Sequence, residues 1–189
     1  MTLLLIGLLL WWGAHLFKRL APDARQALTD KMGDASKGVF AVLLILSIVL
    51  MAKGYRGAEF IDVWYPPSFM VHINNLLMLI AFYVFGASAA KPEKVWLGTK
   101  IRHPQLGAVK IWAFAHLLAN GDLASILLFG GMLAWAVTEM IVINKAEGAW
   151  TPPAQAPAKK EIVLVVVTLV LFSLTAAVHN YLGVSPFGG

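Results

Sequence analysis

The stretch RHPQLGAVKIWAFAHLLANGD, residues 102–122, is the part of this chain that decides its fold. It places two histidines, an arginine and a lysine in or beside an otherwise apolar helix, and a His-Pro pair marks where that helix begins. Ionisable side chains at membrane depth are energetically costly and usually mark functional sites. The stretch therefore predicts a membrane-embedded helix that carries part of a site.

The composition of the whole chain is that of an integral membrane protein. Of the 189 residues, 59% are hydrophobic and 13% are charged, whereas soluble domains carry about 25% charged residues. The apolar runs predict an all-α, polytopic helical bundle that forms a single transmembrane domain over residues 1–189. We expect the first run to be a retained span, because it lacks the basic region and cleavage site of a signal peptide. The six predicted spans are residues 2–20, 38–53, 67–89, 105–120, 123–143 and 161–182.

Lysine and arginine are distributed unevenly between the two ends of the predicted bundle. The loops after the first, third and fifth spans hold most of them, and the loop after the second span holds only Lys53 and Arg56. Because basic loops stay on the cytoplasmic side, we predict a multi-pass protein of the bacterial inner membrane with both termini in the periplasm. The net charge of +5 then faces anionic lipid, so we expect the bilayer as a partner and no nucleic acid. The basic residues of these loops are Lys18, Arg19, Arg25, Lys31, Lys37, Lys91, Lys94, Lys100, Arg102, Lys145, Lys159 and Lys160.

The five histidines are the candidate chemical groups. The chain has no cysteine, which excludes a c-type haem attachment site and thiolate ligands. Imidazole is a common ligand of haem iron, and the spacing of these histidines matches no zinc motif. We rank haem above a site for zinc or copper. We also rank it above a proton relay, because a relay needs carboxylates at the depth of the histidines and only Asp122 and Glu139 come near the spans. The histidines are His15, His72, His103, His116 and His179.

Each histidine has an alternative interpretation as a structural residue that hydrogen-bonds inside the bundle. We interpret His179 and His103 as structural in this way, and we expect functional roles for His15, His72 and His116. At a rise of about 1.5 Å per residue, the predicted depths pair His72 with His116 on the outer side and place His15 toward the cytoplasm.

Other side chains could support a bound macrocycle. Trp11 and Trp112 each lie four residues before a histidine, so each indole shares a helix face with an imidazole. These tryptophans could equally pack only against neighbouring helices. Arg102 and Lys110 are candidates for holding haem propionates, or for binding lipid phosphate at the interface.

The chain resembles NnrU, a family of bacterial membrane proteins that also includes the plant 15-cis-zeta-carotene isomerases. The resemblance covers nearly the whole chain and rests on three motifs: Gly13-Ala14-His15, MVHINNLLML around His72, and RHPQ followed by W-x-x-x-H. It implies a haem b with His15 and His116 as axial ligands, His72 as the first alternate and His103 as the next. The family motifs pair His116 with His15, whereas the predicted depths pair it with His72, and both pairings stay open.

The resemblance also implies a functional setting. Bacterial members are associated with denitrification and nitric oxide metabolism, so we expect a bis-histidine haem for electron transfer or for redox-gated binding of a diatomic gas or small apolar ligand, with an electron donor. Isomerase activity is not transferred, because this chain is much shorter than the plant proteins. The alternative function is a non-catalytic membrane factor for assembly of nitric-oxide-handling enzymes.

A second resemblance implies a different chemistry. Arg102-His103-Pro104 with Gly107 is similar to the start of the S-adenosylmethionine site in isoprenylcysteine carboxyl and phospholipid methyltransferases. The acidic and aromatic second half of that site is missing from the chain, so methyl transfer ranks last. Whether the protein is an enzyme at all does not follow from the sequence.

Overall fold

The computed structural model describes residues 1–89 and 92–188, so Lys91 of the predicted basic loops lies outside the described residues. Over these ranges the chain forms helices joined by loops, with two isolated β-bridges and no strand, which confirms the all-α prediction. The elements are α1 (Thr2–Leu20), α2 (Pro22–Met32), α3 (Ala35–Arg56), α4 (Met70–Gly86), η1 (Trp96–Thr99), α5 (Pro104–Ala119), α6 (Leu123–Glu147) and α7 (Ala158–Tyr181).

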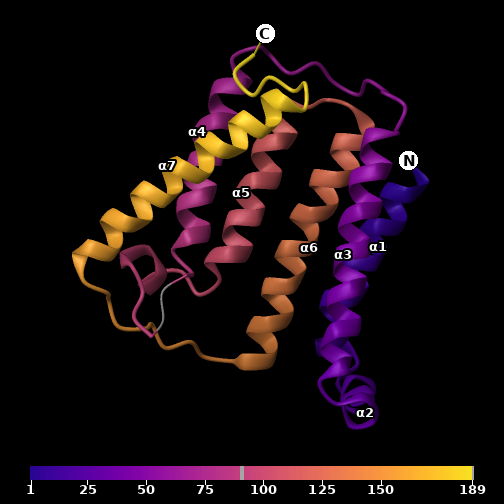
Figure 1. The fold of residues 1–189 in the computed structure, drawn as a ribbon, viewed down its shortest axis with the longest axis vertical. Coiled ribbons are helices and arrows are strands. Elements are labelled where there is room, and N and C mark those ends of the chain that lie inside the picture. Colours follow the sequence, from indigo (N-terminus) through magenta and orange to yellow (C-terminus); the bar gives the residue numbers. More distant parts are fainter. Residues whose placement is uncertain (90–91, 189) are drawn as a thin grey trace.

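Four of these helices, α1, α3, α6 and α7, are long and apolar enough to cross a membrane. Helices α4 and α5 have 17 and 16 residues and occupy the positions of the third and fourth predicted spans. The chain is therefore a membrane protein by the length and composition of its helices, and the count of six passages stays a prediction. Both chain ends lie at the same end of the bundle (Figure 1).

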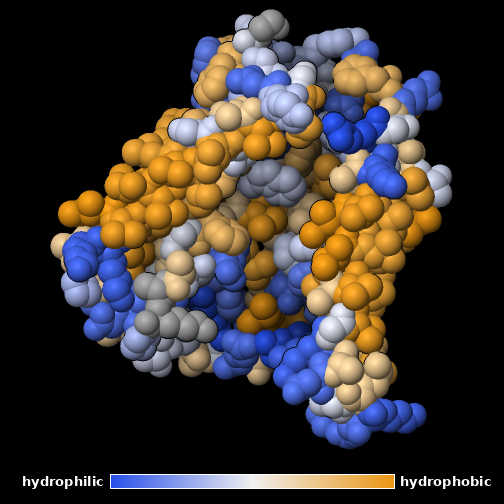
Figure 2. All heavy atoms as spheres, in the orientation of Figure 1, coloured by the Kyte–Doolittle hydropathy of each residue, from blue (hydrophilic) through white to orange (hydrophobic). Residues whose placement is uncertain are grey.

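The helices form two arms with α6 between them (Figure 1). Helices α1 and α3 make one arm, and α4, α5 and α7 make the other, while α6 contacts both α1 and α5. The outward faces of α3 and α7 are strongly apolar (Figure 2). Such faces suit contact with lipid tails.

Small residues bring α1 and α3 close together. A Cβ added at Gly7 would lie 2.7 Å from the backbone nitrogen of Met51 and 2.8 Å from the carbonyl oxygen of Ser47, and one added at Gly54 would collide with the backbone of Leu4. Close backbone approach at small residues is a common means of packing membrane helices. The position of α1, and with it the positions of Trp11 and His15, therefore depends on these glycines.

The end of the bundle near the termini is tied together by polar contacts. The predicted turn at residues 120–122 joins α5 to α6, and the Gly121 carbonyl accepts hydrogen bonds from the backbone of Val63 and Trp64. Asp122 caps α6 by accepting from the Ser125 backbone at 2.9 Å. Tyr55 of α3 shares a 2.8 Å hydrogen bond with the Ser125 hydroxyl. This end therefore joins α3, the loop after it and the α5–α6 turn.

Helix α2 was not predicted, because it lies in the polar loop between the first two spans and buries no residue. Its local signals are nevertheless present in the sequence. Pro22 and Asp23 lie in the first turn of the helix and Lys31 lies in its last turn, which are the positions where proline, acidic and basic residues respectively favour a helix. Gly33 then ends the helix with a φ of 57°, a conformation that favours glycine.

Candidate functional site

A cavity of about 640 Å³ lies between α1, α5 and α6. The segments around η1 and Trp150 bound it at one end, and a hollow between the two arms, with a hydrophilic lower rim, is visible in Figure 2. Its volume falls within the range of about 300–1,000 Å³ that is typical of small-molecule sites. Lining residues used below are Trp11, His15, Lys94, Arg102, His103, Trp135 and Glu139.

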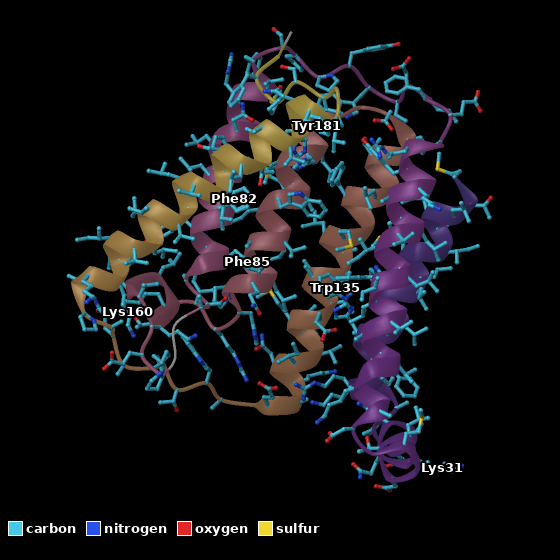
Figure 3. All side chains as sticks on the ribbon, in the orientation of Figure 1. Lys31, Phe82, Phe85, Trp135, Lys160 and Tyr181 are labelled. Carbon is cyan, nitrogen blue, oxygen red and sulfur yellow. The ribbon has the colours of Figure 1, made fainter. Side chains whose placement is uncertain are left out.

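His15 enters this cavity from α1 within a cluster of indole rings. Its ring centroid lies 4.2 Å from that of Trp11 and 4.8 Å from that of Trp135, which projects from α6 toward α1 (Figure 3). The predicted proximity of Trp11 and His15 is confirmed. The Nδ1 atom of His15 hydrogen-bonds to the Trp11 carbonyl at 2.9 Å, which leaves Nε2 to bind a metal or another partner.

Three polar atoms around the cavity are buried without a hydrogen-bond partner among the described residues. They are the indole nitrogens of Trp11 and Trp135 and the Oε2 atom of Glu139. The Trp135 and Glu139 side chains are only 4% and 9% exposed. An unsatisfied buried polar group costs about 1–3 kcal/mol, so two donors and one carboxyl oxygen are available here to a ligand. Neither a role for Trp135 nor a ligand role for Glu139 was predicted from the sequence. Glu139 follows Trp135 by four residues on α6, which is the same spacing as His15 after Trp11 on α1.

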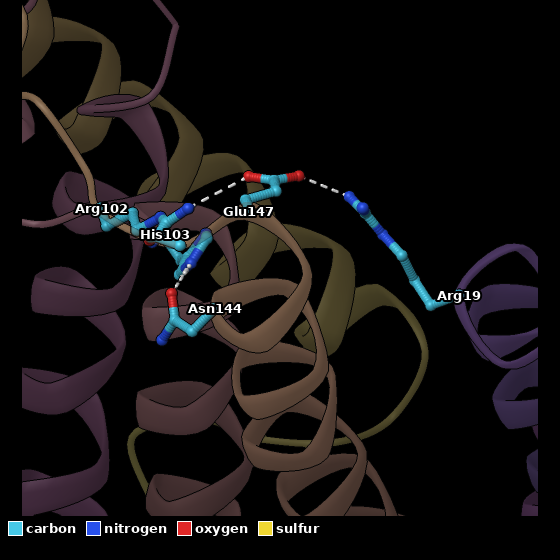
Figure 4. Close-up of polar contacts among 6 residues, drawn as sticks. Arg19, Arg102, His103, Asn144 and Glu147 are labelled. Carbon is cyan, nitrogen blue, oxygen red and sulfur yellow. Dashed lines mark hydrogen bonds and ion pairs between the residues drawn. The ribbon is translucent and has the colours of Figure 1, made fainter.

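One rim of the cavity is crossed by a carboxylate bridge (Figure 4). Arg19 at the end of α1 donates to Oε1 of Glu147 at 2.5 Å. Arg102, in the segment before α5, donates to Oε2 of the same carboxylate at 3.3 Å and to the Gly148 carbonyl at 2.6 Å. Glu147 is the last residue of α6, and its carboxylate links α1 of one arm to the segment before α5 of the other.

The RHPQ motif lies at this rim. His103 shares a 2.9 Å hydrogen bond between its Nε2 and Oδ1 of Asn144 (Figure 4). Arg102 and His103 both line the cavity, whereas Lys110, the other predicted propionate-holding residue, is not among its lining residues. The motif therefore places one cation and one imidazole at the cavity.

His116 lies away from this cavity. Its Nδ1 hydrogen-bonds to the Trp112 carbonyl at 2.9 Å, its ring stacks on Phe129 at 4.6 Å and the Trp112 ring is 5.4 Å away. Phe129 and the Trp135 that contacts His15 are six residues apart, or about 9 Å along α6. His15 and His116 thus sit beside different levels of α6, and their role as an axial pair stays a prediction.

The remaining histidines lie at the other end of the bundle. His72 is exposed on the first turn of α4, and His179 on α7 hydrogen-bonds to the Thr175 carbonyl at 2.8 Å. His179 is close enough to His116 for an electrostatic interaction, a proximity that the sequence did not suggest. The depth-based pairing of His72 with His116 also stays a prediction.

A metal ion bound by side chains alone needs several ligands in one place. Within the described part of the chain, no three or more His, Asp or Glu side chains come together as such a group. Haem differs, because the macrocycle supplies most of the iron ligands and the protein adds one or two. His15 lines the cavity, and its Nε2 has no hydrogen-bond partner among the described residues, so it meets that smaller requirement.

Helices long and apolar enough to span a membrane, with a histidine-lined cavity between helices, define a helical membrane protein with an internal cavity. The family model described as NnrU protein matches residues 3–186. The chain therefore belongs to the NnrU family, which confirms the resemblance drawn from its motifs. No curated protein and no solved structure matches the chain.

Proposed function

We propose that this NnrU-family protein binds haem b in the cavity beside His15 and serves nitric oxide metabolism linked to denitrification in the bacterial inner membrane. The observation that carries the proposal is the state of His15: its Nδ1 is hydrogen-bonded, its Nε2 is left over, and it lines a cavity walled by two indoles. A hydrogen-bonded Nδ1 fixes the ring tautomer and orients Nε2 as a ligand.

The other cavity residues fit the same group. Trp11 and Trp135 carry indole N–H donors without partners among the described residues. Arg102 is held at the rim by Glu147 and the Gly148 carbonyl, and the remaining N–H groups of its guanidinium would be available to a propionate. When bound, the haem supplies a one-electron redox centre that can also bind diatomic gases. The protein residues hold it, exclude water with aromatic side chains and orient its acid groups.

Two further histidines could supply a second ligand to the iron. His116 is the ligand implied by the family motif, and it would have to leave its stacking contact with Phe129. His103 already lines the cavity, but its Nε2 is shared with Asn144. A haem held by two imidazoles is low-spin, whereas one held by His15 alone is high-spin, so the spectrum separates the two arrangements.

Absorbance spectroscopy of the purified protein tests the proposal. Protein from cells supplied with 5-aminolevulinate should show a Soret band, with α and β bands that sharpen after dithionite reduction. His15→Ala should lose the bound haem, while His72→Ala, which removes an exposed imidazole away from the cavity, should retain it. His116→Ala should convert a low-spin spectrum to high-spin if His116 is the second ligand. Colourless, iron-free wild-type protein would refute haem binding and favour the assembly-factor alternative.

A further inference from the structure

The carboxyl group of Glu139 is the part of the cavity that haem ligation does not use. It lies one helical turn after Trp135 on α6, and its side chain is 9% exposed. Its Oε2 atom is buried and has no hydrogen-bond partner among the described residues. A buried carboxyl oxygen without a hydrogen-bond partner is unfavourable, so this oxygen is available to a ligand that enters the cavity.

The cations around Glu139 are already engaged by other acceptors. Arg19 on α1 acts on Glu139 electrostatically, but its guanidinium donates to Glu147. Each of the other charged or titratable cavity groups also has a hydrogen-bond partner within the protein. These groups are His15 on α1, Lys94 before η1, and Arg102 and His103 before α5.

We propose that the cavity binds an acid-bearing ligand together with one proton, and that Glu139 is the residue that carries this proton. The proposal rests on the proposed function, which supplies haem b and its two propionates as the ligand. An ionised Glu139 would repel a propionate, whereas a protonated Glu139 can donate a hydrogen bond to it from the free oxygen. The proton comes from water and binds the Glu139 carboxylate, and no other bond forms or breaks at this residue.

Haem affinity should then depend on pH through Glu139. If one proton accompanies the ligand, the dissociation constant rises by up to about tenfold for each pH unit over which the free protein has lost that proton. Glu139→Gln replaces the carboxyl by an uncharged amide that keeps a hydrogen-bond donor. This variant should bind haem with an affinity that is independent of pH and close to the low-pH affinity of the wild type.

The experiment titrates the apoprotein in detergent micelles with ferric haem b and follows quenching of tryptophan fluorescence. Measurements run from about pH 7.5 to about pH 9, where a histidine of ordinary pKa is mostly neutral. Glu59→Gln, in the exposed loop after α3, makes the same change of charge far from the cavity and should keep the wild-type profile. A wild-type affinity that does not change with pH, or a Glu139→Gln profile equal to that of the wild type, would overturn the inference.

A second measurement uses the wild-type chain alone and does not depend on the folding of a variant. In weakly buffered solution, at a pH where the free protein has lost the Glu139 proton, haem binding should take up about one proton per haem. Haem dimethyl ester, whose propionates carry no charge, should bind without that uptake. Equal proton uptake with the ester would refute the inference even if haem binds. Failure of the wild type to bind haem at any pH would refute the proposed function as well.

Discussion

Gly7→Ala should weaken the contact between α1 and α3. The added Cβ would lie 2.7 Å from the Met51 nitrogen and 2.8 Å from the Ser47 carbonyl oxygen, distances that real Cβ atoms essentially never show. Because both atoms belong to the backbone, the helices must shift rather than a side chain turn aside. Overpacking costs about 1–3 kcal/mol, and alanine regains about 1 kcal/mol over glycine in a helix. We expect a net loss of up to about 2 kcal/mol.

The assay is the free energy of unfolding in mixed micelles, obtained by titration with SDS and followed by far-UV circular dichroism. Gly13→Ala is the matched control, because it makes the same substitution on the same helix where the added Cβ meets nothing within 4 Å. The control should be as stable as the wild type or more stable by up to about 1 kcal/mol. Equal stability of the Gly7 and Gly13 variants would refute the assignment of close helix packing to Gly7.

Three further substitutions probe the two ends of the bundle. Gly121→Ala should lower the thermal midpoint, since the added Cβ collides with the Trp64 carbonyl; an unchanged melting curve would contradict the tight turn. Tyr55→Phe should lose about 0.5–1.5 kcal/mol in the same SDS titration, and this loss should disappear in a Ser125→Ala background. Glu147→Gln should broaden the distance distribution between spin labels at Lys18→Cys and Lys145→Cys, which the cysteine-free chain permits. Electron–electron double resonance measures that distribution, and an unaltered width would show that the carboxylate bridge does not restrain the arms.

The helices could be located from the sequence because apolar runs are long and continuous. The first predicted span, residues 2–20, coincides with α1, whereas the second was predicted as residues 38–53 and α3 runs from Ala35 to Arg56. Apolarity marks the part of a helix that meets lipid tails, but backbone hydrogen bonds continue into the polar interface beyond it. Polar helices such as α2 leave no apolar signal and depend on capping residues for their detection.

The candidate site could be predicted only where its contacts are local. Pairs four residues apart on one helix, such as Trp11 with His15, follow directly from helical geometry. The contacts of His15 with Trp135 and of His116 with Phe129 join different helices. When a helix is apolar on all sides, periodicity does not show which face meets a given neighbour. The location of Glu139 at the cavity was missed for the same reason.

The two ends of the bundle are closed by contacts of different kinds. Backbone hydrogen bonds at Gly121 close one end, while the partly exposed side chain of Glu147 bridges the arms at the other. Exposed ion pairs break and re-form at little cost, whereas the turn cannot separate without disrupting the chain path. A ligand that approached the cavity from the Glu147 side would therefore have only two ion pairs to displace, whereas one that approached from the Gly121 side would have to break backbone hydrogen bonds.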